Sequence, residues 1–385
     1  MKRIAGLLAA VVSAACGSQG SSDAATEFIQ RAIIIAPNDA GADFGCGVAL
    51  SGDGQTLAIG SSSSGLLYVY VLNGSSWVPQ ATLSVDAKWG GFGRGFALSE
   101  DGSTLAATAD FESLDGGDNA DGAVYIFQRR GTGWSQQARL PNPAPVTITD
   151  NFGRVISLSR DGALLAISGK DTAHLYERIS DTWTPQAILP AVGGPVLSGD
   201  GTTLVLGAPE PGPGPAALVF SRDGGSWNQR SSVTYPETPA MGGDVVLSRN
   251  ASTMVLGAVD DEAVGLAYVF EHRGQNWALS GTLTTVAARQ GYGSIPVVMN
   301  DDASRIVVSM PTAASSTDAG WVGAMWVYTR NDTGWGVQRI DAHDDSLRDF
   351  GRHLSLSGDG STLAVASPPQ DFSGRQGEVY VFTTW

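Results

Sequence analysis

The chain has 385 residues and a formal net charge of −15, and only 16% of its residues are charged. An acidic body repels phosphate backbones, which excludes nucleic acid as a partner and excludes charge-driven docking on anionic lipid. Glycine is abundant at 50 residues, and aromatic residues recur at regular intervals. This composition favours many short strands with tight turns over helices.

The first fifteen residues have the pattern of a secretory signal peptide. Two basic residues precede an apolar run from Ile4 to Val12, and small residues at 13–15 lie directly before Cys16. The apolar run is too short to cross a bilayer as a permanent helix. Residues 13–16 resemble the lipobox of bacterial lipoproteins, although Ser13 stands where Leu is usual. The resemblance implies lipidation of Cys16 and an exported, membrane-anchored lipoprotein at the outer membrane or cell surface; the alternative is ordinary cleavage near Ala15.

Residues 16–26 follow as a Gly/Ser-rich tether. Removal of residues 1–15 would take the net charge to −17, because that segment holds two basic and no acidic residues. Only Cys46 then remains besides Cys16, so no disulfide framework exists and stability must come from packing.

From residue 27 onward one sequence unit recurs seven times, at spacings of about 40 to 60 residues, which is the range of propeller blades. Each unit has an apolar stretch, a turn that in most copies reads Ser-x-Asp-Gly, and further apolar stretches. In six copies an aromatic residue is followed seven positions later by Trp, as in Tyr70 and Trp77. The residues before the first turn align at Leu50, Leu98, Leu158, Leu197, Leu247, Val298 and Leu356.

The first copy predicts strands a to d at residues 48–50, 56–59, 67–71 and 77–83, which form one antiparallel blade. The last copy ends at Trp385 with room for three strands only, and residues 28–34 look like the missing strand d. The sequence therefore predicts an all-β, seven-bladed propeller of four-stranded antiparallel blades over residues 27–385. Its N-terminal strand closes the last blade and removes an exposed edge.

Phe-Gly pairs such as Phe350-Gly351, the Ser-x-Asp-Gly turns, and stretches such as residues 204–209 resemble the FG-GAP repeats of integrin α-subunit propellers. That type of propeller serves adhesion, scaffolding and some enzyme-associated roles. Its repeats often bind calcium in a longer turn, whereas the turns here are too short to wrap the ion, so ordinary hairpin turns are expected. The copies with Asn250-Ala251 and Asp302-Ala303 lack even the Asp-Gly signal of a turn.

In an up-and-down blade the a–b and c–d turns lie on one face, and the b–c and d–a connections lie on the other. Length varies in the second set, and variable loops on a rigid scaffold commonly carry binding. The candidates for contact with a protein or glycan ligand on that face are Phe111, Trp321, Phe372, Arg94, Arg154 and Arg352. Two alternatives stay open: the aromatic residues pack onto the blades, and the arginines pair with Asp43, Asp150 or Asp349 instead of an anionic group.

One b–c loop is rich in oxygen-bearing side chains. It holds the candidate calcium ligands Asp115, Asp118, Asn119 and Asp121, although their spacing matches no established motif and a solvated acidic loop is the alternative. No other cofactor is indicated.

No catalytic motif occurs, and Cys46 occupies the position of Arg94 in its repeat, which favours a buried thiol over a nucleophile. The sequence thus predicts a non-enzymatic, surface-tethered binding or adhesion module. The alternatives are a structural subunit of an envelope complex and an enzyme whose acidic loops form a site.

Overall fold

The fold was analysed in a computed structural model of the chain. It describes residues 27–86, 91–113, 120–143, 152–191, 193–207, 215–237, 241–260, 262, 264–285, 295–311, 313, 323–342, 349–369 and 376–384. The described residues form seven four-stranded antiparallel sheets. They hold no helix long and apolar enough to cross a membrane.

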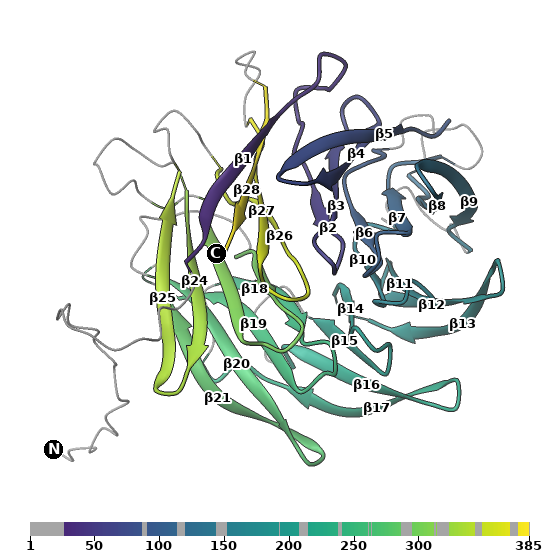
Figure 1. Ribbon diagram of the computed structural model, residues 1–385. Coiled ribbons are helices and arrows are strands. Elements are labelled where there is room, and N and C mark those ends of the chain that lie inside the picture. The colour runs from purple at the N-terminus through teal and green to yellow at the C-terminus, as the bar shows by residue number, and fades with distance from the viewer. Residues whose placement is uncertain are drawn as a thin grey trace, which may run out of the picture.

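The sheets follow one another around a ring as the blades of a propeller (Figure 1). Blade one comprises β2 (Val48–Leu50), β3 (Thr56–Ser61), β4 (Leu66–Asn73) and β5 (Ser76–Leu83). Blade two comprises β6 (Phe96–Leu98), β7 (Thr104–Ala109), β8 (Ala123–Arg130) and β9 (Gly133–Pro141). Blade three comprises β10 (Ile156–Leu158), β11 (Leu164–Gly169), β12 (Thr172–Ile179) and β13 (Thr182–Pro190). In each blade the order is that predicted for strands a to d.

Blade four comprises β14 (Pro195–Leu197), β15 (Thr203–Gly207), β16 (Ala217–Asp223) and β17 (Ser226–Val233). Blade five comprises β18 (Met241–Leu247), β19 (Thr253–Val259), β20 (Gly265–Arg273) and β21 (Asn276–Thr284). Blade six comprises β22 (Val297–Met299), β23 (Arg305–Met310), β24 (Ala324–Asn331) and β25 (Gly334–Asp341). Blade seven comprises β26 (His353–Leu356), β27 (Thr362–Ser367), β28 (Glu378–Thr383) and, as its fourth strand, β1 (Ile29–Ile35).

The N-terminal strand closes the ring, as the sequence predicts. β1 pairs antiparallel with β28, with Ile33 opposite Tyr380 and Ile35 opposite Glu378. In Figure 1 the purple β1 lies beside the yellow strands of the C-terminus. No edge of β28 is left unpaired, so the first and last segments of the chain hold each other in place.

The core lies between the blades. Strand b is buried along its whole length in β3, β7, β23 and β27, because both of its faces are covered by neighbouring blades. The buried apolar residues form seven clusters, and each cluster combines two neighbouring blades. The outermost strand d is exposed on one side, as the pattern of β5 illustrates. Stability therefore comes from contacts between blades as much as from pairing within them.

The Phe-Gly pair has the same role in blades one, two, three and seven. Phe44, Phe92, Phe152 and Phe350 are at most 2% exposed, and the glycine after each has a φ between 87° and 89°. That left-handed backbone turns the chain from the core into strand a, and it favours glycine because a Cβ is strained there.

Two details of the sequence alignment are wrong. In blade six the residue equivalent to Leu50 is Met299, not Val298, because Met299 pairs with Ile306 as Leu50 pairs with Leu57. The turns of blades five and six are also retained. Asn250 Oδ1 accepts from the Ser252 amide at 3.1 Å, as Asp101 Oδ1 accepts from the Ser103 amide at 2.9 Å, and Ala251 adopts a φ of 51°.

Candidate functional site

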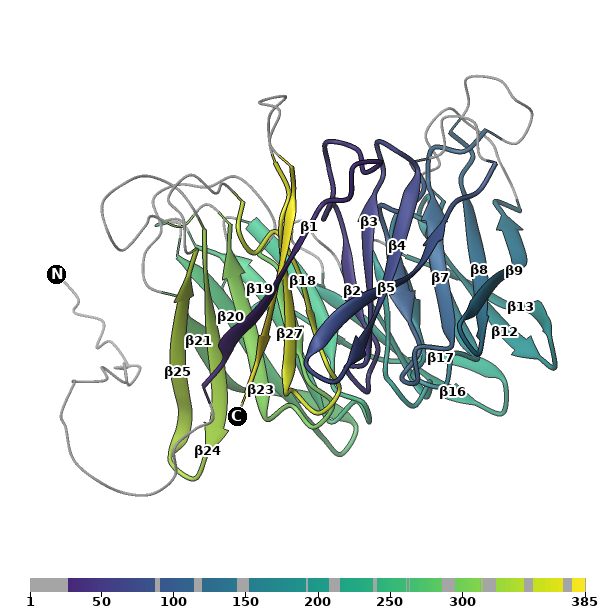
Figure 2. The same ribbon diagram turned by 45° about the horizontal axis from the view of Figure 1, so that its top comes forward.

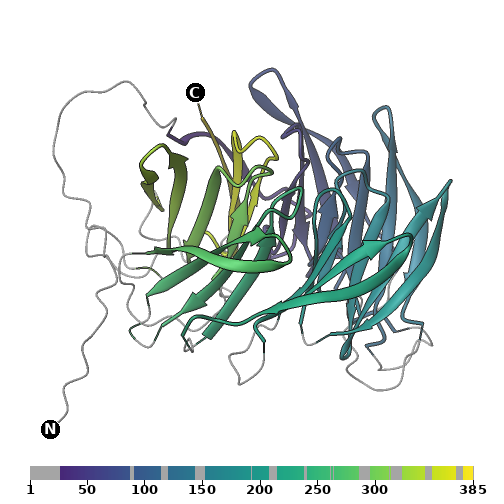
Figure 3. The ribbon, with the colours of Figure 1, turned by 90° about the horizontal axis from the view of Figure 1, so that it is seen from below.

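The propeller has two unlike faces. We call the side with the a–b and c–d turns the turn face, and the side with the b–c and d–a connections the loop face. Figure 2 shows the ring from the side, and Figure 3 shows the hairpin tips gathered on one side of it. Of the candidate contact residues, the described ones, Arg94, Phe111, Arg154 and Arg352, lie on the loop face.

On the turn face, backbone hydrogen bonds link all seven a–b turns into a closed ring. Each bond joins one blade to the next at 2.7 to 3.0 Å. The pairs, donor first, are Gly358 to Gly52, Asp53 to Glu100, Glu100 to Arg160, Arg160 to Gly199, Asp200 to Arg249, Arg249 to Asp301, and Asp301 to Gly358. The turns are thus fixed relative to one another without help from side chains.

Side chains then close the centre of this ring. Arg249 of blade five forms an ion pair with Glu100 of blade two at 2.9 Å and lies 3.6 Å from Asp301 of blade six, which also binds Arg160 of blade three. We call these four residues the charged quartet. Hydrogen bonding and the negative charge of Glu100 raise the pKa of Arg249. Because its members come from opposite sides of the ring, the charged quartet bridges the central opening.

Three glycines make room for the charged quartet. A Cβ on Gly199 would lie 2.7 Å from Cγ of Arg160 and 2.9 Å from Cγ of Arg249, and one on Gly358 would lie 2.7 Å from Oδ2 of Asp301. Gly52 would meet Arg160 in the same way. Each a–b turn contributes one residue to this centre. The seven residues are two acids (Glu100 and Asp301), two arginines (Arg160 and Arg249) and three glycines (Gly52, Gly199 and Gly358), and the small size of the glycines leaves space for the four charged side chains.

On the loop face, Arg94, Arg154 and Arg352 occupy the same position of blades two, three and seven, just before strand a, and all three are exposed. Arg352 lies 3.6 Å from Asp349, as one of the alternatives predicts. Asp43 instead accepts hydrogen bonds from Ser61, Ser62 and Ser63; burial would raise its pKa, but these bonds outweigh that effect and lower it. Within the described residues neither Arg94 nor Arg154 forms an ion pair.

Phe111 is 43% exposed, and the Arg94 guanidinium lies over its ring at 5.6 Å from the centroid. The neighbouring Asp110 is 2% exposed, and its Oδ1 has no hydrogen-bond partner. Burial raises the pKa of Asp110, while the positive charges of Arg94 and Arg154 oppose that rise. Asp110, Arg94 and Arg154 therefore lie close enough on the loop face for their charges to interact.

Glu112 lies just before the loop that holds the candidate calcium ligands, and its carboxylate is bound by other side chains of blade two. It accepts from the Tyr125 hydroxyl at 2.8 Å and pairs with Arg139 at 2.6 Å. Burial and the bond to Glu112 raise the pKa of Tyr125 to about 12.

Three further titratable groups are buried or half-buried: Cys46, His353 and His174. Burial raises the pKa of Cys46 to about 11, and its thiol donates to the Gly93 carbonyl at 3.4 Å. Burial lowers the pKa of His353 to about 4, helped by the positive charges of Arg352 and Arg94. His174 packs edge-on against Phe152. Cys46 is therefore protonated and His353 neutral at pH 7.

Several predicted site residues lie outside the described part of the chain: Cys16, Trp321, Phe372, Asp115, Asp118, Asn119 and Asp150. Asp121 is described and is 5% exposed, and its carbonyl accepts from Asn142 at 3.1 Å. Among the described residues no three His, Cys, Asp or Glu side chains gather as a metal site.

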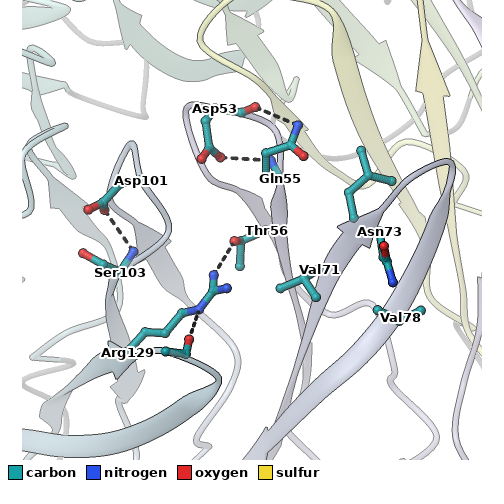
Figure 4. Close-up of a pocket in the computed structure, with 11 residues that line it drawn as sticks. Asp53, Gln55, Thr56, Val71, Asn73, Val78, Asp101, Ser103 and Arg129 are labelled. Carbon is teal, nitrogen blue, oxygen red and sulfur yellow. Dashed lines mark hydrogen bonds between the residues drawn. The ribbon is translucent and has the colours of Figure 1, made fainter.

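Sequence reasoning missed a cavity on the turn face between blades one and two (Figure 4). It has a volume of about 550 Å³ and is lined by residues of both blades, including Thr56, Val71 and Arg129. It also missed the charged quartet. The repeats place Arg129 and the charged quartet at fixed offsets from Trp134 and from the turn residues, but those offsets alone do not show which residues meet across the ring.

Comparison with solved structures supports the propeller fold. The β-propeller domain of Cps50 (Swd1) from Myceliophteria thermophila is 11% identical with a TM-score of 0.60, over 93% of this chain and 100% of that one. A chain of the mitotic checkpoint complex is 14% identical with a TM-score of 0.57, over 97% and 99%. A functionally unknown protein from Desulfotomaculum acetoxidans DSM 771 is 12% identical with a TM-score of 0.55, over 79% and 86%.

At these identities the likeness establishes the fold alone. No protein-family model matches the chain, and no curated protein matches its sequence. The resemblance of the repeats to FG-GAP repeats therefore stays a prediction from the sequence.

Proposed function

We propose that the protein is an exported, lipid-anchored binding module whose loop face recognises an acidic surface of a protein partner. The propeller fold suits a protein-binding or scaffold role, since its ring is rigid and its connections vary in length. The observation that carries the proposal is the exposed Arg94–Phe111 pair next to Arg154. Arginine and aromatic residues dominate the energetic centres of protein interfaces.

Charge supports the choice of partner. The chain carries a net charge of −15, yet Arg94 and Arg154 are exposed and form no ion pair within the described residues. A local positive patch on an acidic protein would steer an acidic partner to this place and keep it away from other surfaces.

Site-specific photo-crosslinking in intact cells tests this function. A photoreactive amino acid at Phe111 is expected to trap one discrete protein partner, whereas the same group at Arg230, an exposed residue of β17, is expected to trap none. The variant Arg94→Ala/Arg154→Ala should abolish the crosslink at Phe111. Equal crosslinking at Phe111 and Arg230, or a product sensitive to glycosidase instead of protease, would overturn a protein partner.

The anchor has its own test. Under the proposal the small residues before Cys16 direct lipid attachment, and several acyl chains together hold a protein stably in a membrane. Cys16→Ser should move the protein from the membrane pellet to the soluble fraction after cell lysis. A serine variant that still sediments with membranes contradicts the anchor.

A further inference from the structure

One position at the end of strand c carries an arginine in four blades. Arg129, Arg178, Arg222 and Arg330 each precede the Trp of the next strand by five residues, and each donates its backbone amide to the carbonyl after the turn of its own blade. We call these four residues the interblade arginines, because each side chain reaches toward the preceding blade.

Three interblade arginines find an oxygen acceptor at one shared position of that preceding blade. Arg222 binds Glu177 Oε2 at 2.7 Å, and Arg330 binds Glu271 Oε1 at 2.8 Å. Arg178 donates to Gln128 Oε1 at 2.7 Å. Gln128, Glu177 and Glu271 occupy equivalent positions in strand c, because each lies opposite the first residue of strand b in its own blade. Those first residues are Thr104, Leu164 and Thr253, respectively.

Blade one breaks this pattern. Its equivalent residue is Val71, which pairs with Thr56. Arg129 therefore donates only to the Thr56 hydroxyl and to the Gly131 carbonyl, each at 3.1 Å, and it forms no ion pair within the described residues (Figure 4). A guanidinium has five N–H donors in a planar fork that matches a carboxylate. The acceptor that the other interfaces supply is missing here.

A cavity occupies the place of the missing acceptor. It has a volume of about 550 Å³, within the range of small-molecule sites, and combines Arg129 with an apolar wall that includes Val71, Leu72 and Val78. Asp53 and Asp101 lie in the turns at its rim, where each carboxylate accepts a backbone amide through Oδ1. These two acids disfavour a multiply charged anion, and they can accept N–H donors from a ligand.

We propose that this cavity binds a small aliphatic carboxylate with an amino group, the free counterpart of the Glu177 side chain that fills the equivalent place between blades three and four. The carboxylate would take the fork of Arg129, the short apolar stem would lie along Val71 and Val78, and the ammonium group would face Asp101. The site lies on the turn face, so its existence does not depend on the partner proposed for the loop face.

The substitution Val71→Glu offers a sharp test, because it supplies from the chain the carboxylate that the ligand would supply. Titration of the full-length protein with L-glutamate, followed by nitrogen–proton NMR at the backbone amides of the lining residues Ser103 and Gly131, should give a saturable shift at millimolar concentration. Val71→Glu and Arg129→Gln should each weaken binding roughly tenfold to a hundredfold, in line with a charge-assisted bond. Arg178→Gln is the matched control and should leave the affinity unchanged.

Melting curves separate loss of the site from loss of the fold. Val71→Glu is expected to melt at or above the temperature of the wild type, since it forms an internal ion pair with Arg129. Glutarate, which lacks the amino group, should bind more weakly than L-glutamate if Asp101 or Asp53 takes part. The absence of a saturable shift with L-glutamate, or undiminished binding by folded Val71→Glu, would overturn the proposal.

Discussion

The turn face and the loop face are built from the same repeats, but they differ in how their polar groups are paired. On the turn face each a–b turn bonds to the next, and the charged quartet closes the centre. On the loop face, Arg94 and Arg154 stay exposed without an ion pair in the described residues, and Asp110 is buried beside them with Oδ1 unpartnered. Satisfied polar groups indicate a structural role, whereas exposed or unsatisfied ones indicate a place for a ligand.

Opening the ring should have the largest effect on stability, because the ring supports both the turn face and the loop face. Deletion of residues 27–36 removes β1, leaves β28 as an exposed edge, and uncovers the core that Phe28 and Ile34 help to form. We expect aggregation or loss of a cooperative melting transition, measured by light scattering and calorimetry. Deletion of residues 17–24 in the tether serves as the control; a monomeric β1 deletion with an unchanged melting temperature contradicts closure.

Breaking the charged quartet comes next. Asp301→Ala leaves Arg160 without its acid, and both side chains are about one-fifth exposed, at 21% and 18%. We expect the free energy of unfolding to fall by about 2 to 3 kcal/mol, below the range for a fully buried pair because solvent screens the charges. Arg154→Ala on the loop face should cost less than about 0.5 kcal/mol in the same denaturant titration. Equal costs at the two positions would erase the energetic difference between the faces.

A pH effect is expected at His353, near the loop-face arginines. Its pKa falls from 6.5 to about 4 in the folded protein, so protonation favours the unfolded chain. The stability due to neutral His353 is complete above about pH 6.5 and decreases toward pH 4, by about 2 kcal/mol at pH 5. His353→Gln should lose this component, seen as a flatter dependence of unfolding free energy on pH. Parallel profiles for the two proteins would contradict it.

The smallest expected effect is the difference in stability between two glycine variants on the turn face. Gly102→Ala forces an L residue to a φ of 62° and places its Cβ 2.5 Å from Thr56 Oγ1, so we expect a loss of about 2 kcal/mol. Gly201→Ala has a similar φ of 68°, but its nearest neighbour is 3.5 Å away, so about 1 kcal/mol is expected. Thermal melts of both variants measure the difference. A cost that is larger for Gly201 would refute the steric explanation.

The repeat made the architecture predictable, because each unit carries its own turn residues and its own apolar alternation. Even the closing strand followed from counting strands after residue 350. The a–b turns of blades five and six were not predicted, because Ala251 and Ala303 adopt a left-handed backbone that Gly usually marks in a sequence. Asn250 and Asp302 nevertheless keep the hydrogen bonds of the turn.

The site was less predictable. The charged quartet joins residues up to 149 positions apart, and only the ring geometry brings Glu100 to Arg249. The cavity at Arg129 arises from the absence of an acid at Val71, and that absence has meaning only once the other interfaces show what normally lies there. Sequence motifs report what is present in one repeat, whereas these sites arise from differences among repeats.

The closed ring on the turn face also links substitutions in distant parts of the chain, because a change at one of its positions affects which residues fit at the others. Seven side-chain positions, one per blade, point into one opening, so a larger residue at Gly199 or Gly358 would have to be matched by a smaller one at Arg160 or Asp301. A charge reversal at Glu100 would similarly call for one at Arg249. Mutations here should therefore be epistatic across blades, and related sequences should change these positions as a set.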